Sequence, residues 1–580
     1  MTIFNVLSFI GGISIFLLGM NLMGKSLEKR AGDKLKGVIN KLTSNKFTGF
    51  LTGLLVTAII QSSSATTVMV VGFVNSGLMS LSQAVGVIMG ANIGTTVTSW
   101  ILSLTGLSGS NIFVQLLKPS SFSPILALIG IILYMFFKDD KKKDTGMILL
   151  GFAVLMFGME TMSSSVSGLK NVESFRNLFV AFENPLLGIL VGAGVTAIIQ
   201  SSSASIGILQ AFATTGQIKY GACVPIILGQ NIGTCVTALI SSIGTNKNAK
   251  RASLVHLFFN LIGTAIFITL YLIVKAVFKP LILDESASLV GIAIIHTGFN
   301  VFCTLMMLPA SKLLEKLVCL IVPDSKDNKV AELDERLFVT PSIALGTVKS
   351  KIMEMAEATR TALTLSIEGL FSSEDKFNEI HKYEDRTDEL EDIIGTYLVK
   401  LSAKELDIKE SRTSGEYLKV IGDLERIADH ALNLAKLEKE IREKDIHFSS
   451  KAQEELHKIT KAVLDVWDIT AQALDQYDIN LAKHVEPLEQ VIDKLNEIIR
   501  NRHIERLQKD ECNINVGFVW ADILSNLERI SDHCSNIAGC IIDDAQKDMN
   551  MHININEYKH NNEEFNELYD EYSQKYLLGI

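Results

Sequence analysis

Two identical polar runs stand out because each interrupts a long apolar stretch. Gln61-Ser62-Ser63-Ser64 lies within Phe50–Val74, and Gln200-Ser201-Ser202-Ser203 lies within Leu186–Ala213. Serine hydroxyls and glutamine amides can both donate and accept hydrogen bonds, and their oxygens also suit a small hard cation. Together, the two runs have the chemistry to bind a tetrahedral oxyanion and a sodium ion.

A second pair of polar motifs follows the two runs. The sequences GANIGTT (Gly90–Thr96) and GQNIGTC (Gly229–Cys235) place glycine and asparagine within apolar spans. We expect unwound turns here, each with an amide side chain turned inward. The predicted substrate and sodium site therefore combines residues of all four motifs and their neighbours: Gln61, Ser62, Ser63, Ser64, Thr66, Asn92, Thr95, Gln200, Ser201, Ser202, Ser203, Ser205, Asn231 and Thr234.

None of these elements contains arginine or lysine. A buried anion without a counter-charge is very costly, so an anion bound here needs neutral hydrogen bonds and a cation bound beside it. That requirement points to cation-coupled symport. The alternative is that the small residues only allow helices to pack closely. Two related runs in one chain favour binding over packing.

The elements that must position these residues are membrane helices. Seven other apolar stretches are nearly long enough to span a bilayer. We expect the first, Ile3–Met23, to be retained as a transmembrane helix because it lacks the basic region and the cleavage site of a signal peptide. The seven stretches are Ile3–Met23, Leu81–Leu104, Ser123–Phe137, Gly146–Met162, Val224–Ile243, Leu254–Phe278 and Ser288–Leu308. The two interrupted stretches are poor simple spans, and we expect them to form re-entrant hairpins, with their polar tips lining protein or a water-filled cavity.

The membrane half is an internal duplication. Residues 51–98 and 190–237 align without a gap and share 23 of 48 residues. Lysine and arginine gather in loops that should face the cytoplasm, and equivalent loops of the two copies then face opposite sides. The predicted fold is therefore all-α, with inverted-topology repeats at about 12–106 and 151–245 inside a transmembrane domain at 1–310. This arrangement places the N-terminus outside and the second half of the chain in the cytoplasm.

Charge separates the chain into two parts. Residues 1–320 carry a net charge of +11, and the remainder carries −21. After a polar linker at 311–340, helical apolar periodicity predicts a soluble bundle at 341–545, followed by a polar tail at 546–580 that is either partly disordered or a terminal helix. The bundle is also duplicated, because DLERIADHALNLA (Asp423–Ala435) recurs as NLERISDHCSNIA (Asn526–Ala538).

Paired carboxylates recur at matched positions of the two bundle repeats. Each pair has i,i+4 spacing, so both side chains share one helix face, and neighbouring helices with such pairs could bind divalent cations through oxygen ligands. The alternative is a solvated acidic surface. The predicted metal ligands are Glu384, Asp388, Glu425, Asp429, Glu489, Asp493, Glu528 and Asp532.

Both halves resemble known families. The doubled QSSSA hairpins with NIGT motifs resemble the type II sodium-dependent phosphate cotransporters, including their bacterial members, over about Gly12–Leu308. This resemblance implies sodium and inorganic phosphate as substrates in the inner or plasma membrane. Residues of about Pro341–Asp544 resemble PhoU-type domains with two three-helix repeats. That resemblance implies a phosphate-linked regulatory module holding a metal cluster, of a divalent ion or of iron, zinc or manganese.

Several other readings stay open or are disfavoured. A symporter of another oxyanion, and a membrane phosphate receptor that signals through the bundle, are both compatible with the motifs. The sequence leaves homo-oligomers and phosphate-signalling partners open as well. An enzyme is disfavoured because no P-loop, catalytic triad or hydrolase metal spacing occurs. No basic face suits nucleic acid, and the seven cysteines lack CxxC spacing and read as reduced.

Overall fold

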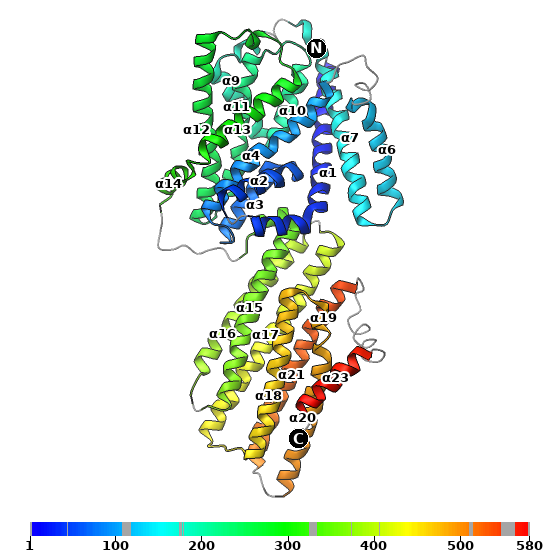
Figure 1. The fold of residues 1–580 in the computed structure, drawn as a ribbon, viewed down its shortest axis with the longest axis vertical. Helices are drawn as coiled ribbons and strands as arrows, with labels where there is room; N and C mark the ends of the chain where they lie inside the picture. Colours follow the sequence, from blue (N-terminus) through cyan, green and yellow to red (C-terminus); the bar gives the residue numbers. More distant parts are fainter. Residues whose placement is uncertain are drawn as a thin grey trace. The chain divides into compact units, whose positions relative to one another are not determined.

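The computed structural model of the chain describes residues 3–42, 45–106, 118–172, 177, 179–323, 333–372, 374–404, 406–509, 514–546 and 563–577. Within these residues the secondary structure is helical apart from one isolated bridge between Lys219 and Ser286. The chain divides into two compact units, Met1–Ile343 and Ala344–Ile580. Each unit is described by itself (Figure 1).

The first unit contains the membrane helices. Seven of its described helices are long and apolar enough to span a bilayer, which agrees with the number of predicted spans. They are α1 (Ile3–Leu42), α4 (Leu81–Ser103), α6 (Pro119–Phe136), α7 (Asp140–Val166), α11 (Tyr220–Ser241), α12 (Lys247–Phe278) and α13 (Leu289–Met307). The equivalent helices α1 and α7 pack along each other through a core that includes Phe16, Leu155 and Met159.

The two interrupted stretches are helical hairpins, as predicted. Hairpin 1 consists of α2 (Lys46–Ile60) and α3 (Ser63–Asn75), and hairpin 2 consists of α9 (Pro185–Ile199) and α10 (Ser202–Ala213). All four helices are shorter than a simple span. The asparagines Asn45 and Asn184 cap the first helix of each hairpin by accepting hydrogen bonds from backbone amides.

The expected unwound turns in the GANIG and GQNIG motifs are wrong. Both α4 and α11 continue through these motifs as unbroken α-helices. The glycines instead allow neighbouring backbones to approach. A Cβ atom on Gly90 would lie 2.0 Å from the carbonyl oxygen of Phe50, and one on Gly229 would lie 2.0 Å from that of Ile189. Glycine therefore lets α4 pack against α2, and α11 against α9, at backbone contact.

The segment that follows the last span also contains structure. Within the predicted linker 311–340, α14 spans Ser311–Ile321 and a 3-10 helix, η4, spans Glu335–Val339. One face of α14 is buried through Leu314 and Val318. Both pieces lie in the first unit.

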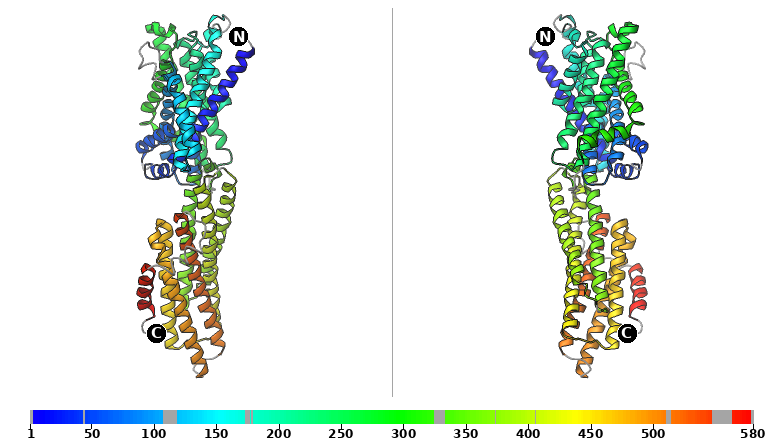
Figure 2. Two further views of the ribbon diagram at one scale, coloured as in Figure 1. Left: turned by 90° about the vertical axis from the view of Figure 1, so that its right-hand side faces the viewer. Right: turned by 90° about the vertical axis from the view of Figure 1, so that its left-hand side faces the viewer.

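The second unit is a bundle of long helices that run side by side (Figures 1 and 2). As predicted, it has two three-helix repeats. The first comprises α15 (Pro341–Gly369), α16 (Phe377–Ser402) and α17 (Ile408–Glu443), and the second comprises α18 (Ser450–Gln476), α20 (Val485–Gln508) and α21 (Ile514–Gln546). The equivalent helices α17 and α21 pack together through buried residues that include Leu424, Ile427, Leu527 and Ile530.

Two shorter helices complete the second unit. The single turn α19 (Ile479–Ala482) precedes α20, and α23 (Glu563–Tyr576) packs against α20. Part of the predicted polar tail is thus helical, while residues 547–562 and 578–580 lie outside the described part. The six described cysteines are free, and all but Cys319 are buried.

Candidate functional site

Each hairpin turns at the glutamine of its polar run. Gln61 and Gln200 adopt left-handed backbone angles, with φ of 62° and 58°, and cap the ends of α2 and α9. Ser62 and Ser201 then cap the next helix, each accepting a hydrogen bond from the amide three residues on. A left-handed glutamine is uncommon and costs energy, and such conformations concentrate at functional sites. Here the same conformation occurs at both tips.

The two tips meet. The hydroxyl of Ser64 on hairpin 1 donates to the backbone carbonyl of Gln200 on hairpin 2 over 3.2 Å. Thr98 on α4 also joins the hairpins, because it donates to Oε1 of Gln61 over 2.8 Å and accepts from the hydroxyl of Ser203 over 3.3 Å. Residues that are more than a hundred positions apart in the chain thus form one polar cluster.

The cluster brings two helix N-termini together. Helices α3 and α10 begin at Ser63 and Ser202, directly after the left-handed turns. The N-terminus of a helix presents unpaired amides and a positive end of the helix dipole, so it favours an anion. Serine and threonine hydroxyls beside it can bind either the anion or a hard cation. The arrangement therefore has the chemistry expected of a shared oxyanion and sodium site.

The two hairpins are not equivalent in detail. In hairpin 1, Thr57 donates to Thr66 over 3.0 Å. In hairpin 2, the hydroxyl of the matching Thr196 has no partner within the described structure, and the matching Ser205 accepts from Gln230 over 2.9 Å instead.

The difference extends to the glutamines. The side chain of Gln61 is buried and bonded to Thr98, whereas Gln200 is exposed. Thr237, the counterpart of Thr98, has a buried hydroxyl without a partner among the described residues. Hairpin 1 therefore has the more buried tip, and its threonines and glutamine form hydrogen bonds that their counterparts around hairpin 2 lack in the described structure.

Four of the predicted site residues form their described hydrogen bonds away from the tips. Asn92 faces His256 on α12, with its Oδ1 3.3 Å from Nε2 of the imidazole. Thr95, Asn231 and Thr234 bond to carbonyls of their own helices. Their role in binding stays a prediction.

Thr98 and Thr57 were not among the predicted site residues, although both recur as threonine at the 139-residue repeat offset. This recurrence is the sequence signal that could have identified them.

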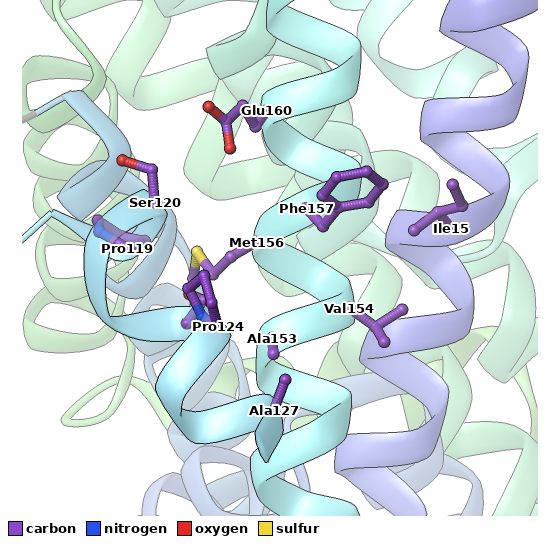
Figure 3. Close-up of a pocket in the computed structure, with 11 residues that line it drawn as sticks. Ile15, Pro119, Ser120, Pro124, Ala127, Ala153, Val154, Met156, Phe157 and Glu160 are labelled. Atoms are coloured by element: carbon purple, nitrogen blue, oxygen red, sulfur yellow. The ribbon is translucent and has the colours of Figure 1, made fainter. Parts of the chain in front are cut away.

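An apolar cavity of about 320 Å³ lies elsewhere in the first unit, between α1, α6 and α7 (Figure 3). Its lining includes Pro124, Met156, Phe157 and one carboxylate, Glu160. An oxyanion requires hydrogen-bond donors and would be repelled by a carboxylate. We therefore place the candidate substrate site at the hairpin tips and not in this cavity.

The second unit brings three of the eight predicted metal ligands together. In its second repeat, carboxylate oxygens of Glu489, Asp493 and Asp532 all lie within 4.8 Å of one another. Burial raises the pKa of Asp493 to about 6, and the nearby carboxylates of Asp532 and Glu528 add to the rise. Glu528 itself accepts from Asn496 over 2.6 Å and from Arg500 over 3.1 Å. The cluster fits a hard cation, whose charge would relieve the repulsion between these carboxylates.

The first repeat contains the matching carboxylates. Burial, followed by the charges of Asp429, Glu391 and Asp388, raises the pKa of Glu425 to about 7. Burial also raises the pKa values of Glu384 and Asp388, with Asp429 contributing to both.

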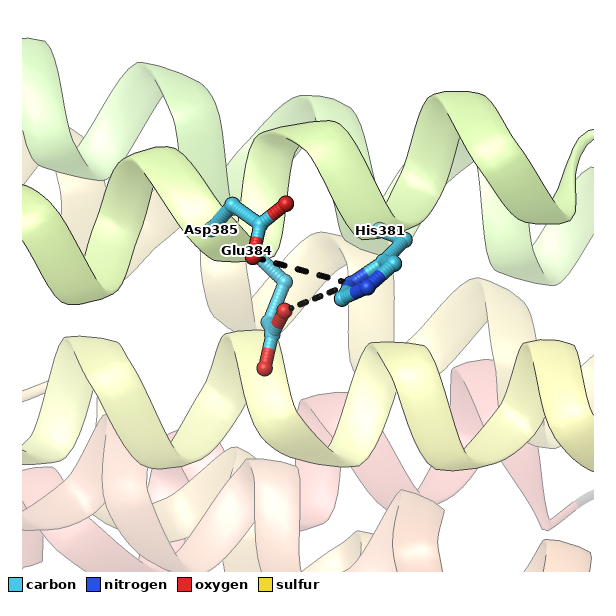
Figure 4. Close-up of side chains that lie close together, drawn as sticks. All are labelled: His381, Glu384 and Asp385. Carbon is cyan, nitrogen blue, oxygen red and sulfur yellow. Dashed lines mark hydrogen bonds and ion pairs between the residues drawn. The ribbon is translucent and has the colours of Figure 1, made fainter.

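A histidine joins this region. Nδ1 of His381 lies 3.0 Å from Glu384 and 3.9 Å from Asp385 (Figure 4). The i,i+3 and i,i+4 spacings from His381 could have indicated these neighbours, but the sequence prediction used only the carboxylate pairs.

Comparison with known proteins agrees with both halves of this description. The family profile described as Na+/Pi-cotransporter matches residues 15–164 and again 155–303, and the PhoU domain profile matches 352–437 and 456–541. The chain belongs to the Na+/Pi-cotransporter family and carries a PhoU domain. It is therefore a membrane protein of a phosphate-transporter family, and the double match of each profile follows the two duplications.

Individual relatives extend these matches. The chain is 22% identical over 553 residues to the putative inorganic phosphate export protein YjbB of Salmonella typhimurium, covering 94% of this chain and 98% of the relative. It is 39% identical over 98 residues to the sodium-dependent phosphate transport protein 2A of Rattus norvegicus, covering 16% and 15% of the two chains. A crystal structure of PhoU from Pseudomonas aeruginosa aligns with 35% of this chain and 98% of its own, at 21% identity and a TM-score of 0.34.

Proposed function

We propose that this protein is a sodium-coupled symporter of inorganic phosphate, with the site at the meeting hairpin tips. The contact between Ser64 and the carbonyl of Gln200 carries the proposal, because it joins two helix N-termini and two serine runs without any basic side chain. A phosphate ion bound by amides and hydroxyls alone would need a co-bound cation. The sodium-dependent name of the rat relative supports sodium in that role.

The proposal includes alternating access around the tips. In inverted-repeat transporters, rocking or gating of one repeat against the other exposes a fixed midplane site to each side in turn. The difference between the buried tip of hairpin 1 and the exposed Gln200 of hairpin 2 supports such a cycle. In an inverted repeat, the two equivalent hairpins would exchange these conformations when the site changes from one side of the membrane to the other.

Phosphate export is the second candidate direction, and it is favoured by the name of the Salmonella relative, a phosphate export protein. The same site serves either direction, because the ion gradients decide the sign of net flux. Radiolabelled phosphate flux in proteoliposomes tests both, with sodium placed outside, inside or on both sides. Flux driven by a sodium gradient is expected, with loss in Gln61→Ala and Gln200→Ala. Unchanged flux in both variants would overturn the proposed site.

The same proteoliposomes can test whether the protein transports another oxyanion instead of phosphate. Sulfate and a carboxylate at equal concentration should leave phosphate flux largely unaffected if phosphate is the substrate, whereas arsenate, which has nearly the same shape and charge as phosphate, should compete with it. A phosphate receptor, in contrast, would bind phosphate without any flux across the bilayer.

For the second unit we propose a cytoplasmic regulatory domain that binds metal in both repeats. Glu489, Asp493 and Asp532 would hold a cation in one repeat, and Glu384, Asp388, Glu425 and Asp429 would hold one in the other. Their raised pKa values support this assignment, because clustered carboxylates repel one another until a cation offsets their charge. Elemental analysis of the purified full-length protein after loading with iron, zinc or manganese tests the assignment. A protein that retains no stoichiometric metal would favour a solvated acidic surface.

A further inference from the structure

The segment between the last span and the PhoU domain binds hairpin 1 at both of its ends. At the start of the hairpin, Nζ of Lys46 donates to the hydroxyl of Ser311 over 2.9 Å and pairs with Glu315 over 2.8 Å. Lys46 is the first residue of α2, and Ser311 is the first residue of α14. The end of α14 is also held, because Arg251 on α12 donates twice to the carbonyl of Val322.

The other end of the hairpin contacts the residues around η4. Asn75, the last residue of α3, donates to Asp334 over 2.8 Å, and Asp334 pairs with Arg336 over 3.0 Å. Asp334 is only 2% exposed. A buried carboxylate is stable only with such partners, so this contact is specific and not an accidental surface pair.

Further contacts surround this ion pair. Arg336 donates to the carbonyls of Ser241 and Ile243 at the end of α11. Leu337 is fully buried over Gly72 of α3, where a Cβ would lie 2.9 Å from the leucine side chain. Thr340 donates to Glu28 on α1 over 2.5 Å. The residues Asp334–Thr340 thus cover the end of hairpin 1 opposite its polar tip.

We propose that residues 311–323 and 333–340 form a clasp on hairpin 1. Asp334 and Arg336 are its positioning residues. The contact of Asp334 with Asn75 and the contacts of Arg336 with the end of α11 must open during transport. The tip of this hairpin is the more buried of the two, because Gln61 is buried and accepts a hydrogen bond from Thr98. Moving the hairpin away from α4 requires α3 to shift. The contacts of Asn75 with Asp334 and of Gly72 with Leu337 oppose this shift, together with the hydrogen bonds that Asn75 accepts from Asn246 at the start of α12.

The position of the clasp in the chain gives it a regulatory role. Thr340 is followed directly by Pro341, the first residue of α15, and α15 continues without a break into the second unit, which begins at Ala344. The clasp therefore links the state of that domain to the freedom of hairpin 1. A displacement at the start of α15 would change how readily the contacts of Asp334 and Arg336 open.

The test is to bridge the clasp reversibly in the full-length protein. The double variant Asn75→Cys/Asp334→Cys is treated with a short bifunctional methanethiosulfonate reagent, which dithiothreitol later removes. We expect sodium-driven phosphate flux in proteoliposomes to fall at least about tenfold when the bridge is present and to recover on reduction. Phosphate binding to the purified protein should change less than about twofold, because the bridge lies away from the tips. The two single-cysteine variants and the wild-type chain, treated identically, control for reaction at native cysteines.

A second readout does not depend on what the protein transports. Hydrogen–deuterium exchange of the hairpin 1 peptides between Val56 and Asn75 should slow about tenfold or more in the bridged protein. Arg336→Met, which removes the donors to α11, should accelerate exchange in the same peptides. Flux and exchange rates that are equal in the bridged and reduced protein would overturn the clasp. The flux experiment rests on the proposed function, so a reduced protein without flux would count against that function. The exchange experiment tests the clasp independently of what the protein transports.

Discussion

The hydroxyl of Ser64 donates to the backbone carbonyl of Gln200, and this hydrogen bond joins the tips of two hairpins from opposite halves of an inverted repeat. Because the tips touch, a change at one hairpin alters the environment of the other. The candidate site therefore belongs to neither repeat alone, and substitutions in the two copies should have unequal effects wherever their hydrogen bonds differ.

The first prediction uses the unequal pair Thr98 and Thr237. Thr98→Val keeps the side-chain shape but removes the hydrogen bonds to both Gln61 and Ser203. Losing two hydrogen bonds and leaving their buried partners unsatisfied costs about 1–3 kcal/mol. Phosphate transport at limiting substrate should therefore fall by about 5- to 150-fold. The matched control is Thr237→Val, whose hydroxyl has no described partner. Equal losses of flux in the two variants would contradict the assignment of Thr98 as the bridge.

The second prediction concerns backbone contact between α4 and α2. Gly90→Ala would place a Cβ 2.0 Å from the carbonyl oxygen of Phe50, so the helices must separate. Such overpacking costs about 1–3 kcal/mol, and thermal unfolding of the purified protein should shift downward. Gly194→Ala on α9 is the control, because nothing lies within 4 Å of its added Cβ. A Gly90→Ala protein as stable as this control would show that the close approach is not required.

The third prediction addresses metal content. Asp493→Asn should lower the bound divalent metal of the full-length protein by one cluster, while leaving the first repeat loaded. Asn retains the size of the side chain but supplies a weaker, uncharged ligand. Glu497→Gln on the same helix provides the control, since Glu497 pairs with Lys494 outside the cluster. Metal analysis after gel filtration gives the stoichiometry, and equal metal in all three proteins would exclude Asp493 as a ligand.

The fourth prediction is a pH dependence of the metal-free protein. The pKa of Glu425 is raised to about 7 and that of Asp493 to about 6, so in the folded state both groups hold protons that the unfolded chain has already released. Stability contributed by these groups is therefore present at low pH and is lost as pH rises, from 3.8 to about 6 for Asp493 and from 4.5 to about 7 for Glu425. In chelator, the midpoint of thermal unfolding of the second unit should be higher at pH 5 than at pH 8.

Removing the two groups isolates their contribution. The variant Glu425→Gln/Asp493→Asn should show a smaller difference between pH 5 and pH 8 than the wild-type protein. Added manganese should restore stability at pH 8 in the wild type, because a bound cation offsets the carboxylate charges. An unchanged pH difference in the variant would indicate that other groups control it.

Much of the architecture follows from local sequence. Stretches of spanning length predict helices in a bilayer, and the polar runs at Gln61 and Gln200 predict breaks because no apolar helix continues through them. The repeated DLERIADH and NLERISDH segments likewise predict matched helices in a duplicated bundle. The structure confirms these elements, since hydrophobic periodicity and capping residues act over a few neighbouring positions.

Tertiary packing decided what the repeated sequence could not distinguish. Thr98 and Thr237 are the same residue at matching positions of the two repeats, yet within the described structure only Thr98 bonds to the glutamine of its hairpin, because the surroundings of the two hairpins differ. The same holds for α4 and α11, where glycines that suggested unwinding instead form backbone contacts with a neighbouring helix. The contacts of Asp334 with Asn75 join positions 259 residues apart. Sequence by itself determined the helices, their breaks and the duplications, and only the packed structure determined which polar groups meet, because such partners are chosen by contacts between distant segments.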